Sequence, residues 1–117
     1  MLQERAPYVA SMIREATSTD TFTAHFPRID SYDFLLVRSL SVSNADNSGI
    51  RLEVGIAYNN VTLWVQSIVC TNNAYFYRMS GTLVVPRGYK VAIRVNSPND
   101  GDTFYANVTG ELVSYGD

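Results

Sequence analysis

Residues 81–112 decide the fold and read GTLVVPRGYKVAIRVNSPNDGDTFYANVTGEL. A short apolar run, 83–85, ends at Pro86, and two segments in which apolar and polar residues alternate follow at 89–96 and 103–112. A period of two is typical of a strand that buries one face. Residues 87–88 and 97–101 between the segments are turn formers. The stretch predicts three strands joined by two tight turns, with an antiparallel hairpin across residues 97–101.

Segments of the same kind fill the rest of the chain. Strands are expected at 22–26, 33–42, 50–58, 61–70 and 74–79, with polar turns between them. The strands 33–42 and 61–70 have apolar residues on both faces. For 33–42 this predicts cover on both sides, either by the N-terminal segment or by another subunit. With no long amphipathic helix among them, the pattern predicts an all-β fold: an antiparallel β-sandwich, jelly-roll-like, of about seven to eight strands.

The N-terminal residues 1–18 allow two readings, and residues 19–117 are expected to form the single β-sandwich domain. Tyr8, Val9, Met12 and Ile13 lie at helical spacing, with Pro7 suited to a first turn, so a short amphipathic helix is one reading. The other is an extended arm that becomes ordered against a neighbouring subunit, leaving the sandwich folded without it. Helices this short are marginal alone, and the sequence leaves both readings open.

Composition bounds the kind of partner. The chain has 117 residues, of which 46% are hydrophobic and 17% charged, and its net charge is −2. This balance gives no general attraction to nucleic acid or to an anionic membrane. No apolar run is long enough for a membrane helix, and the N-terminus lacks the apolar core of a signal peptide. A low charged fraction instead favours a surface that is partly covered by association with other proteins.

Residues with catalytic or metal-binding chemistry are sparse. The single histidine, His25, has no partner motif for a triad or a zinc site, and the single cysteine, Cys70, excludes an intrachain disulfide. Asp100 and Asp102 in one loop, and Asp46 in another, are oxygen ligands of the kind calcium uses, but ordinary turn residues are the favoured interpretation. The chain is therefore expected not to be an enzyme, and to bind no cofactor or metal.

Aromatic residues supply the other candidate site. Eight tyrosines, five phenylalanines and one tryptophan are many for this length, and those outside the core suit an interface. The alternative is a carbohydrate-stacking platform made of Trp64, Tyr58, Tyr75, Tyr77 and Tyr105. The residues expected to make contacts with a partner are Tyr8, Val9, Met12, Ile13, Trp64, Tyr75 and Tyr77.

Two segments carry a resemblance. Residues 37–44 read VRSLSVSN, and the stretch from Leu83 follows the pattern LxVPxGYxVxIxV and ends as GDxxxxxxxGxL. Over residues 33–113 the chain resembles small β-sandwich proteins of tailed bacteriophage virions. Related arrangements occur in capsid decoration proteins, in tail and fibre components, and in trimeric jelly-rolls of the tumour necrosis factor type. These proteins share packing rather than a site motif.

The resemblance implies a function in assembly. It implies a virion protein made in the host cytoplasm, most simply a capsid decoration protein that cements the head lattice through its N-terminal arm and sheet edges. A homotrimer bound to the major capsid protein is the expected state, with no nucleic acid or membrane as partner. A tail, neck or fibre component is an alternative within this class, and a carbohydrate-binding module is the alternative outside it.

Overall fold

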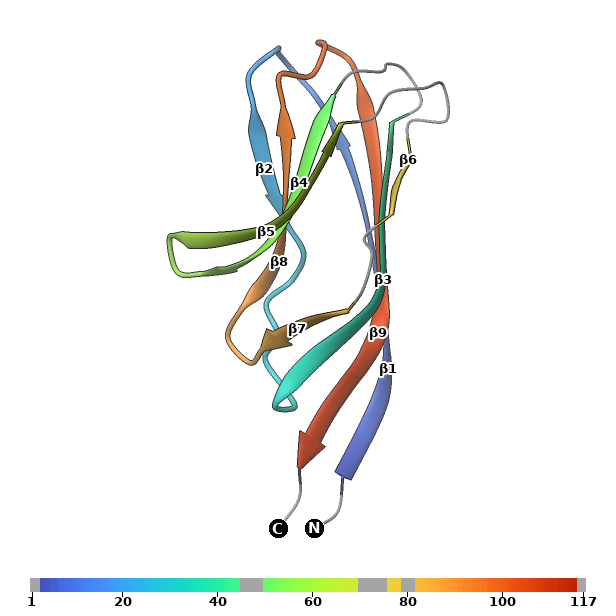
Figure 1. Ribbon diagram of the computed structural model, residues 1–117, viewed down its shortest axis with the longest axis vertical. Helices are drawn as coiled ribbons and strands as arrows, with labels where there is room; N and C mark the ends of the chain where they lie inside the picture. The colour runs from blue at the N-terminus through green and yellow to red at the C-terminus, as the bar shows by residue number, and fades with distance from the viewer. Residues whose placement is uncertain (1–2, 45–49, 70–75, 79–81, 116–117) are drawn as a thin grey trace.

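The structure, a computed structural model, describes residues 3–44, 50–69, 76–78 and 82–115 (Figure 1). The described residues form strands and no helix. The strands are β1 (Gln3–Glu15), β2 (Phe22–His25), β3 (Phe34–Asn44), β4 (Arg51–Tyr58), β5 (Val61–Val69), β6 (Phe76–Arg78), β7 (Leu83–Pro86), β8 (Lys90–Asn96) and β9 (Thr103–Tyr115). Each lies where the alternating or apolar pattern predicted a strand, except β1, which occupies the ambiguous N-terminal segment.

The strands form two antiparallel sheets packed face to face, which confirms the predicted β-sandwich. Sheet 1 has the order β1-β9-β3, with β6 and β7 pairing with successive parts of β3, and sheet 2 has the order β2-β8-β4-β5. If β6 and β7 are taken as one interrupted strand, the eight strands have the order of a jelly-roll. Among the described strands, β4 and β5 are the only consecutive pair that hydrogen-bond to each other.

The core lies between the two sheets and consists of the inward-facing residues of both. Buried side chains alternate with exposed ones along β9 from Phe104 to Thr109, and half or more of the positions of β4 and of β8 hold buried side chains. The largest of them are Leu35, Leu40, Leu52, Val37, Val42, Val54, Val85, Val91, Val95, Val108 and Val113. All but Val113 belong to one contiguous cluster, and the burial of apolar area in this cluster is the main stabilising contribution to the fold.

The predicted hairpin across residues 97–101 is wrong. β8 pairs with β2 and β4 in sheet 2, whereas β9 pairs with β1 and β3 in sheet 1, so the loop crosses from one sheet to the other. Backbone hydrogen bonds hold this crossing in place: Gly101 donates to the carbonyl of Ala16, and Ala16 donates to that of Asp102, each at 2.8 Å. Alternation shows that a strand buries one face, but it does not identify the strand's neighbours.

The helical reading of the N-terminal segment is also wrong. The segment is extended, as in the other reading, but it pairs with a strand of its own chain. β1 pairs antiparallel with β9 along its whole length, from Gln3 opposite Tyr115 to Glu15 opposite Thr103. β1 is the edge strand of sheet 1, so it does not cover the face of β3. The N-terminal segment is therefore not the cover that the two-sided apolar pattern of β3 predicted. The N-terminal segment is therefore part of the sandwich and not a separate arm in front of it.

Two β-bulges bend the sheets, and a glycine faces each of them. In β3 the register shifts at Arg38, and in β5 it shifts at Val65. A Cβ atom built on Gly110 would overlap the carbonyl oxygen of Leu36, and one built on Gly55 would overlap that of Leu63. Bulges increase the local twist and bring neighbouring backbones unusually close, so only glycine fits at these two positions.

Candidate functional site

The four predicted contact residues of the N-terminal segment divide between the two faces of β1. Tyr8 and Met12 are half-buried and pack against the core, where burial raises the pKa of the Tyr8 hydroxyl. Val9 and Ile13 point the other way and are 73% and 67% exposed. Only Val9 and Ile13 are thus free to contact a partner, and Tyr8 and Met12 have a structural role in the sandwich.

Val9 and Ile13 belong to a larger patch on the outer side of sheet 1, which we call the uncharged face. Three rows cross β1, β9 and β3 in register, and none of their outward residues carries a charge. The rows are Val9, Thr109 and Ser39; Ser11, Asn107 and Ser41; and Ile13, Tyr105 and Ser43. Tyr105 is 42% exposed beside Ile13, and the Ser11 hydroxyl lies 2.8 Å from Asn107 Oδ1. Exposed apolar side chains among small polar ones are typical of contact surfaces between proteins.

A charged cluster bounds this face on one side. Glu111 accepts hydrogen bonds from Arg5 at 2.7 Å and from Arg38, the bulge residue of β3, at 3.4 Å. The bond from Arg5 is the main reason that the pKa of Glu111 lies below its usual range. This exposed cluster contributes little to stability, and it limits the uncharged region to the central rows.

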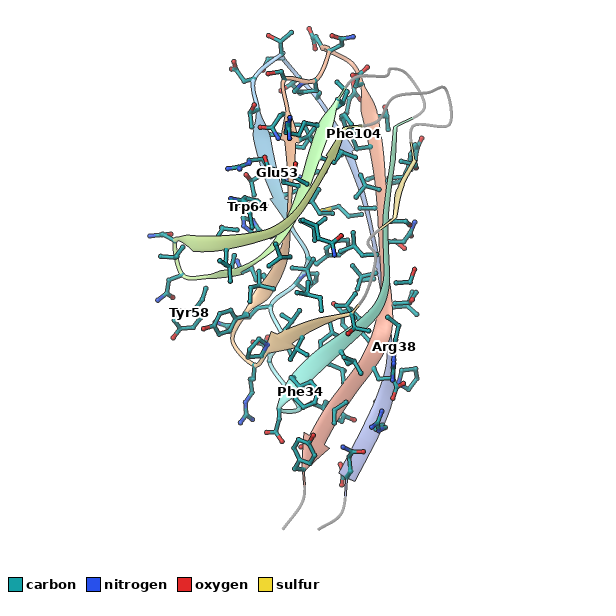
Figure 2. The ribbon with its side chains drawn as sticks, viewed as in Figure 1. Phe34, Arg38, Glu53, Tyr58, Trp64 and Phe104 are labelled. Carbon is teal, nitrogen blue, oxygen red and sulfur yellow. The ribbon has the colours of Figure 1, made fainter. Side chains whose placement is uncertain are left out.

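Trp64 lies on the opposite side of the molecule, on the outer face of sheet 2 (Figure 2). The Arg94 guanidinium stacks over its ring, 4.3 Å from the ring centroid, and forms a bidentate pair with Glu53 at 2.9 and 2.7 Å. Asn96 donates a further hydrogen bond of 2.7 Å to Glu53. Gly55, opposite Trp64 in the register, leaves room for the indole on the sheet surface. The arrangement is a rigid polar network with one aromatic face already covered by arginine.

The bonds from Arg94, and then that from Asn96, hold the pKa of Glu53 below its usual range. A carboxylate with a lowered pKa in the folded state contributes stability that is fully present above the unfolded value of 4.5 and is lost as pH falls through the folded value. We expect Glu53→Gln to lower the free energy of unfolding at pH 7 by about 1 kcal/mol. Urea titrations of both proteins at pH 7 and pH 3 should show a smaller difference at pH 3, and an equal difference at both values would contradict this role for Glu53.

Sequence reasoning missed the most exposed apolar strand. The sequence shows that β5 is apolar on both faces but not that it is exposed: Val61 is 73% exposed, Leu63 62% and Val65 42%. The β4–β5 hairpin projects away from the rest of the sandwich (Figure 1), which leaves this face of β5 without cover from the described residues. The available signal was the absence of any charged residue between Glu53 and Arg78, which is unusual for a segment that reaches the surface.

The remaining predictions have mixed outcomes. Tyr75, Cys70 and Asp46 lie outside the described residues, as does the side chain of Tyr77. Asp102 is buried and accepts a hydrogen bond from the Asn99 backbone, which is the role of a turn residue. His25 is exposed on β2, and its pKa is lowered by partial burial and then by the positive charges of Lys90 and Arg14. Within the described ranges, no three side chains of the metal-ligating types cluster together, and no helix could span a membrane.

The predicted aromatic platform for a carbohydrate gains no geometric support. One face of Trp64 lies under Arg94, and Tyr58 is stacked on Tyr89 with the ring centroids 4.9 Å apart. Carbohydrate binding uses open aromatic faces beside polar groups, so it stays a prediction.

No family model matches the chain, and no curated protein matches it at a significant level.

Proposed function

We propose that this protein is a non-catalytic structural component of a tailed-phage virion, a capsid decoration protein that binds the head lattice. The observation that carries the proposal is the uncharged face, where Val9, Ile13 and Tyr105 are exposed on the rigid outer side of sheet 1. The resemblance of residues 33–113 to virion sandwiches supplies the class of assembly. The jelly-roll is compatible with that class and with many others.

The structure changes the proposed mode of attachment. An arm that reaches out to a neighbour would be free of its own sheet, but every residue of β1 from Gln3 to Glu15 has a register partner in β9. Attachment is therefore assigned to side chains on the outward face of β1, supported by β9 and β3. A surface without charged groups can be covered by a partner without the cost of desolvating ions.

Co-sedimentation with capsids assembled without this protein tests the proposal. We expect a Val9→Lys/Ile13→Lys double variant to bind at least about tenfold more weakly than the natural protein, because two ammonium groups would have to be buried in the contact. Both residues are exposed, so the thermal midpoint should stay within a few degrees. The matched control is Val61→Lys, since Val61 is also 73% exposed but lies on sheet 2. At a saturating protein concentration, the Val61→Lys variant should occupy all of its sites on the capsid.

Three outcomes would count against the proposal. Full occupancy by the double variant would remove the uncharged face as the contact. Equal losses with Val61→Lys would point to a general effect of added charge. Binding of the natural protein to isolated tails and not to heads would favour the alternative of a tail, neck or fibre component.

A further inference from the structure

The four edges of the two sheets are protected against further strand pairing to different extents. β1 contains Pro7 and has charged residues near both ends, and β2 has four residues and is followed closely by Pro27. The other edge of sheet 1 is formed by β6, with three residues, and by β7, which has four residues and ends at Pro86. Proline, charge and shortness are the usual means by which an edge strand avoids pairing with another chain. The three edges formed by β1, by β2 and by β6 with β7 therefore carry such protection.

The fourth edge, β5, lacks these features. Its nine residues, VTLWVQSIV, include no proline and no charged residue. Val61 and Leu63 are exposed in the single chain on the face opposite to Trp64, and the bulge residue Val65 is exposed as well. A long, uncharged and apolar edge strand is a site at which another strand adds to the sheet.

Geometry near the hairpin turn shows which backbone groups are free. Asn59 and Asn60 form a two-residue turn, with Tyr58 opposite Val61 and Asn59 at a φ of 54°. The residues that flank such a turn direct their N–H and C=O groups at each other, and the direction alternates along the strand. The backbone groups of Thr62 and Trp64 consequently point away from β4, toward the open edge.

We propose that a second copy of the chain pairs with β5 antiparallel about a two-fold axis beside Leu63. In this register Thr62 of each copy exchanges backbone hydrogen bonds with Trp64 of the other, and Leu63 faces its own symmetry mate. Leu63 of one copy thus covers Leu63 of the other, and Val61 lies opposite the bulge residue Val65 at the end of the ladder. Because the bulge at Val65 bends the strand, the ladder spans residues 61–65. This inference goes beyond the proposed function and does not depend on it.

The choice of a second copy as the partner follows from charge and symmetry. A two-fold contact places the same strand opposite itself, so any charged residue near the axis would meet a like charge. β5 has no charged residue along its whole length, whereas β1 carries Glu4, Arg5, Arg14 and Glu15. The result is a dimer and not the trimer that the resemblance implies, since three copies cannot share one two-fold edge.

Sedimentation equilibrium of the full chain measures the association. We expect a species of twice the 13.0 kDa chain mass, and at least about tenfold weaker association for Leu63→Lys, which places two ammonium groups face to face. Val9→Lys serves as the control, because Val9 has no place in the contact and its variant should associate normally. A chain that stays monomeric up to millimolar concentration, or a trimer unaffected by Leu63→Lys, would overturn the proposal.

Cross-linking tests the register without relying on a destabilising change. In a Cys70→Ser background, Leu63→Cys should form a disulfide-linked dimer on mild oxidation, because facing residues at a non-hydrogen-bonded pair have suitable Cα separation. Val61→Cys should not cross-link to itself, because the register does not place Val61 opposite its own symmetry mate. Equal cross-linking of the two single variants would contradict the paired register. Capsid binding plays no part in either measurement, so the two proposals can fail separately.

Discussion

Deleting residues 1–15 is expected to abolish cooperative folding of the whole chain. The deletion removes β1 and the thirteen register pairs that it makes with β9. It also removes Tyr8, Ala10 and Met12, which pack on the core, and leaves Ala16 as a new N-terminus beside the crossing loop. The loss should exceed about 5 kcal/mol, which is comparable to the total stability of a small domain. Circular dichroism during heating should show no sigmoidal transition.

A shorter deletion provides the control. Removing only residues 1–2 leaves every pair between β1 and β9 in place, so the thermal midpoint should change by no more than a few degrees. If the chain without residues 1–15 kept a cooperative transition near the natural midpoint, the segment would be an accessory arm, as the sequence first allowed. In that case the pairing of β1 with β9 would contribute little to the fold.

The N-terminal segment shows why its conformation could not be read from sequence. Tyr8 and Met12 are four residues apart, as are Val9 and Ile13, and a separation of four fits both a helical face and a strand face. A helix would bring all four side chains to one stripe, whereas the strand places the two pairs on opposite faces. The choice depends on β9, about a hundred residues away in the sequence, which offers a partner over the whole of β1.

The other strands were predictable because most core residues recur at every second position. Val91, Ile93 and Val95 on β8, and Phe104, Ala106 and Val108 on β9, are all buried as the pattern required. The pairing partners of these strands were not predictable, because a period of two shows which face of a strand is buried but not which sheet the strand joins. The same limit applies to the candidate sites. Trp64 is a candidate contact residue by its residue type alone. Its stacking with Arg94, which in turn pairs with Glu53, joins three strands that only the folded sheet brings together.

Gly110→Ala is expected to be the most damaging single substitution among those considered. Gly110 lies on β9 opposite Val37, just before the bulge at Arg38. The added methyl group would overlap the carbonyl oxygen of Leu36 and lie 3.0 Å from its carbonyl carbon and 3.1 Å from the Cα atom of Val37. All of these are backbone atoms in the central strand β3, which cannot rotate away as a side chain can. Overpacking of this kind costs about 3 kcal/mol, which should lower the thermal midpoint by more than about 10 °C.

Thr109→Ala, at the neighbouring position, separates the clash from the general effect of an alanine in a strand. Thr109 is exposed on the uncharged face, so its replacement should cost less than about 1 kcal/mol. If Gly110→Ala and Thr109→Ala had equal midpoints, β9 would have to shift away from β3 at no cost. Because β9 also carries β1 on its other side, such a shift would disturb the pairing along both edges. The close approach of Gly110 to β3 therefore links the bulge to the attachment of β1, and with it to the position of Val9 and Ile13 on the uncharged face.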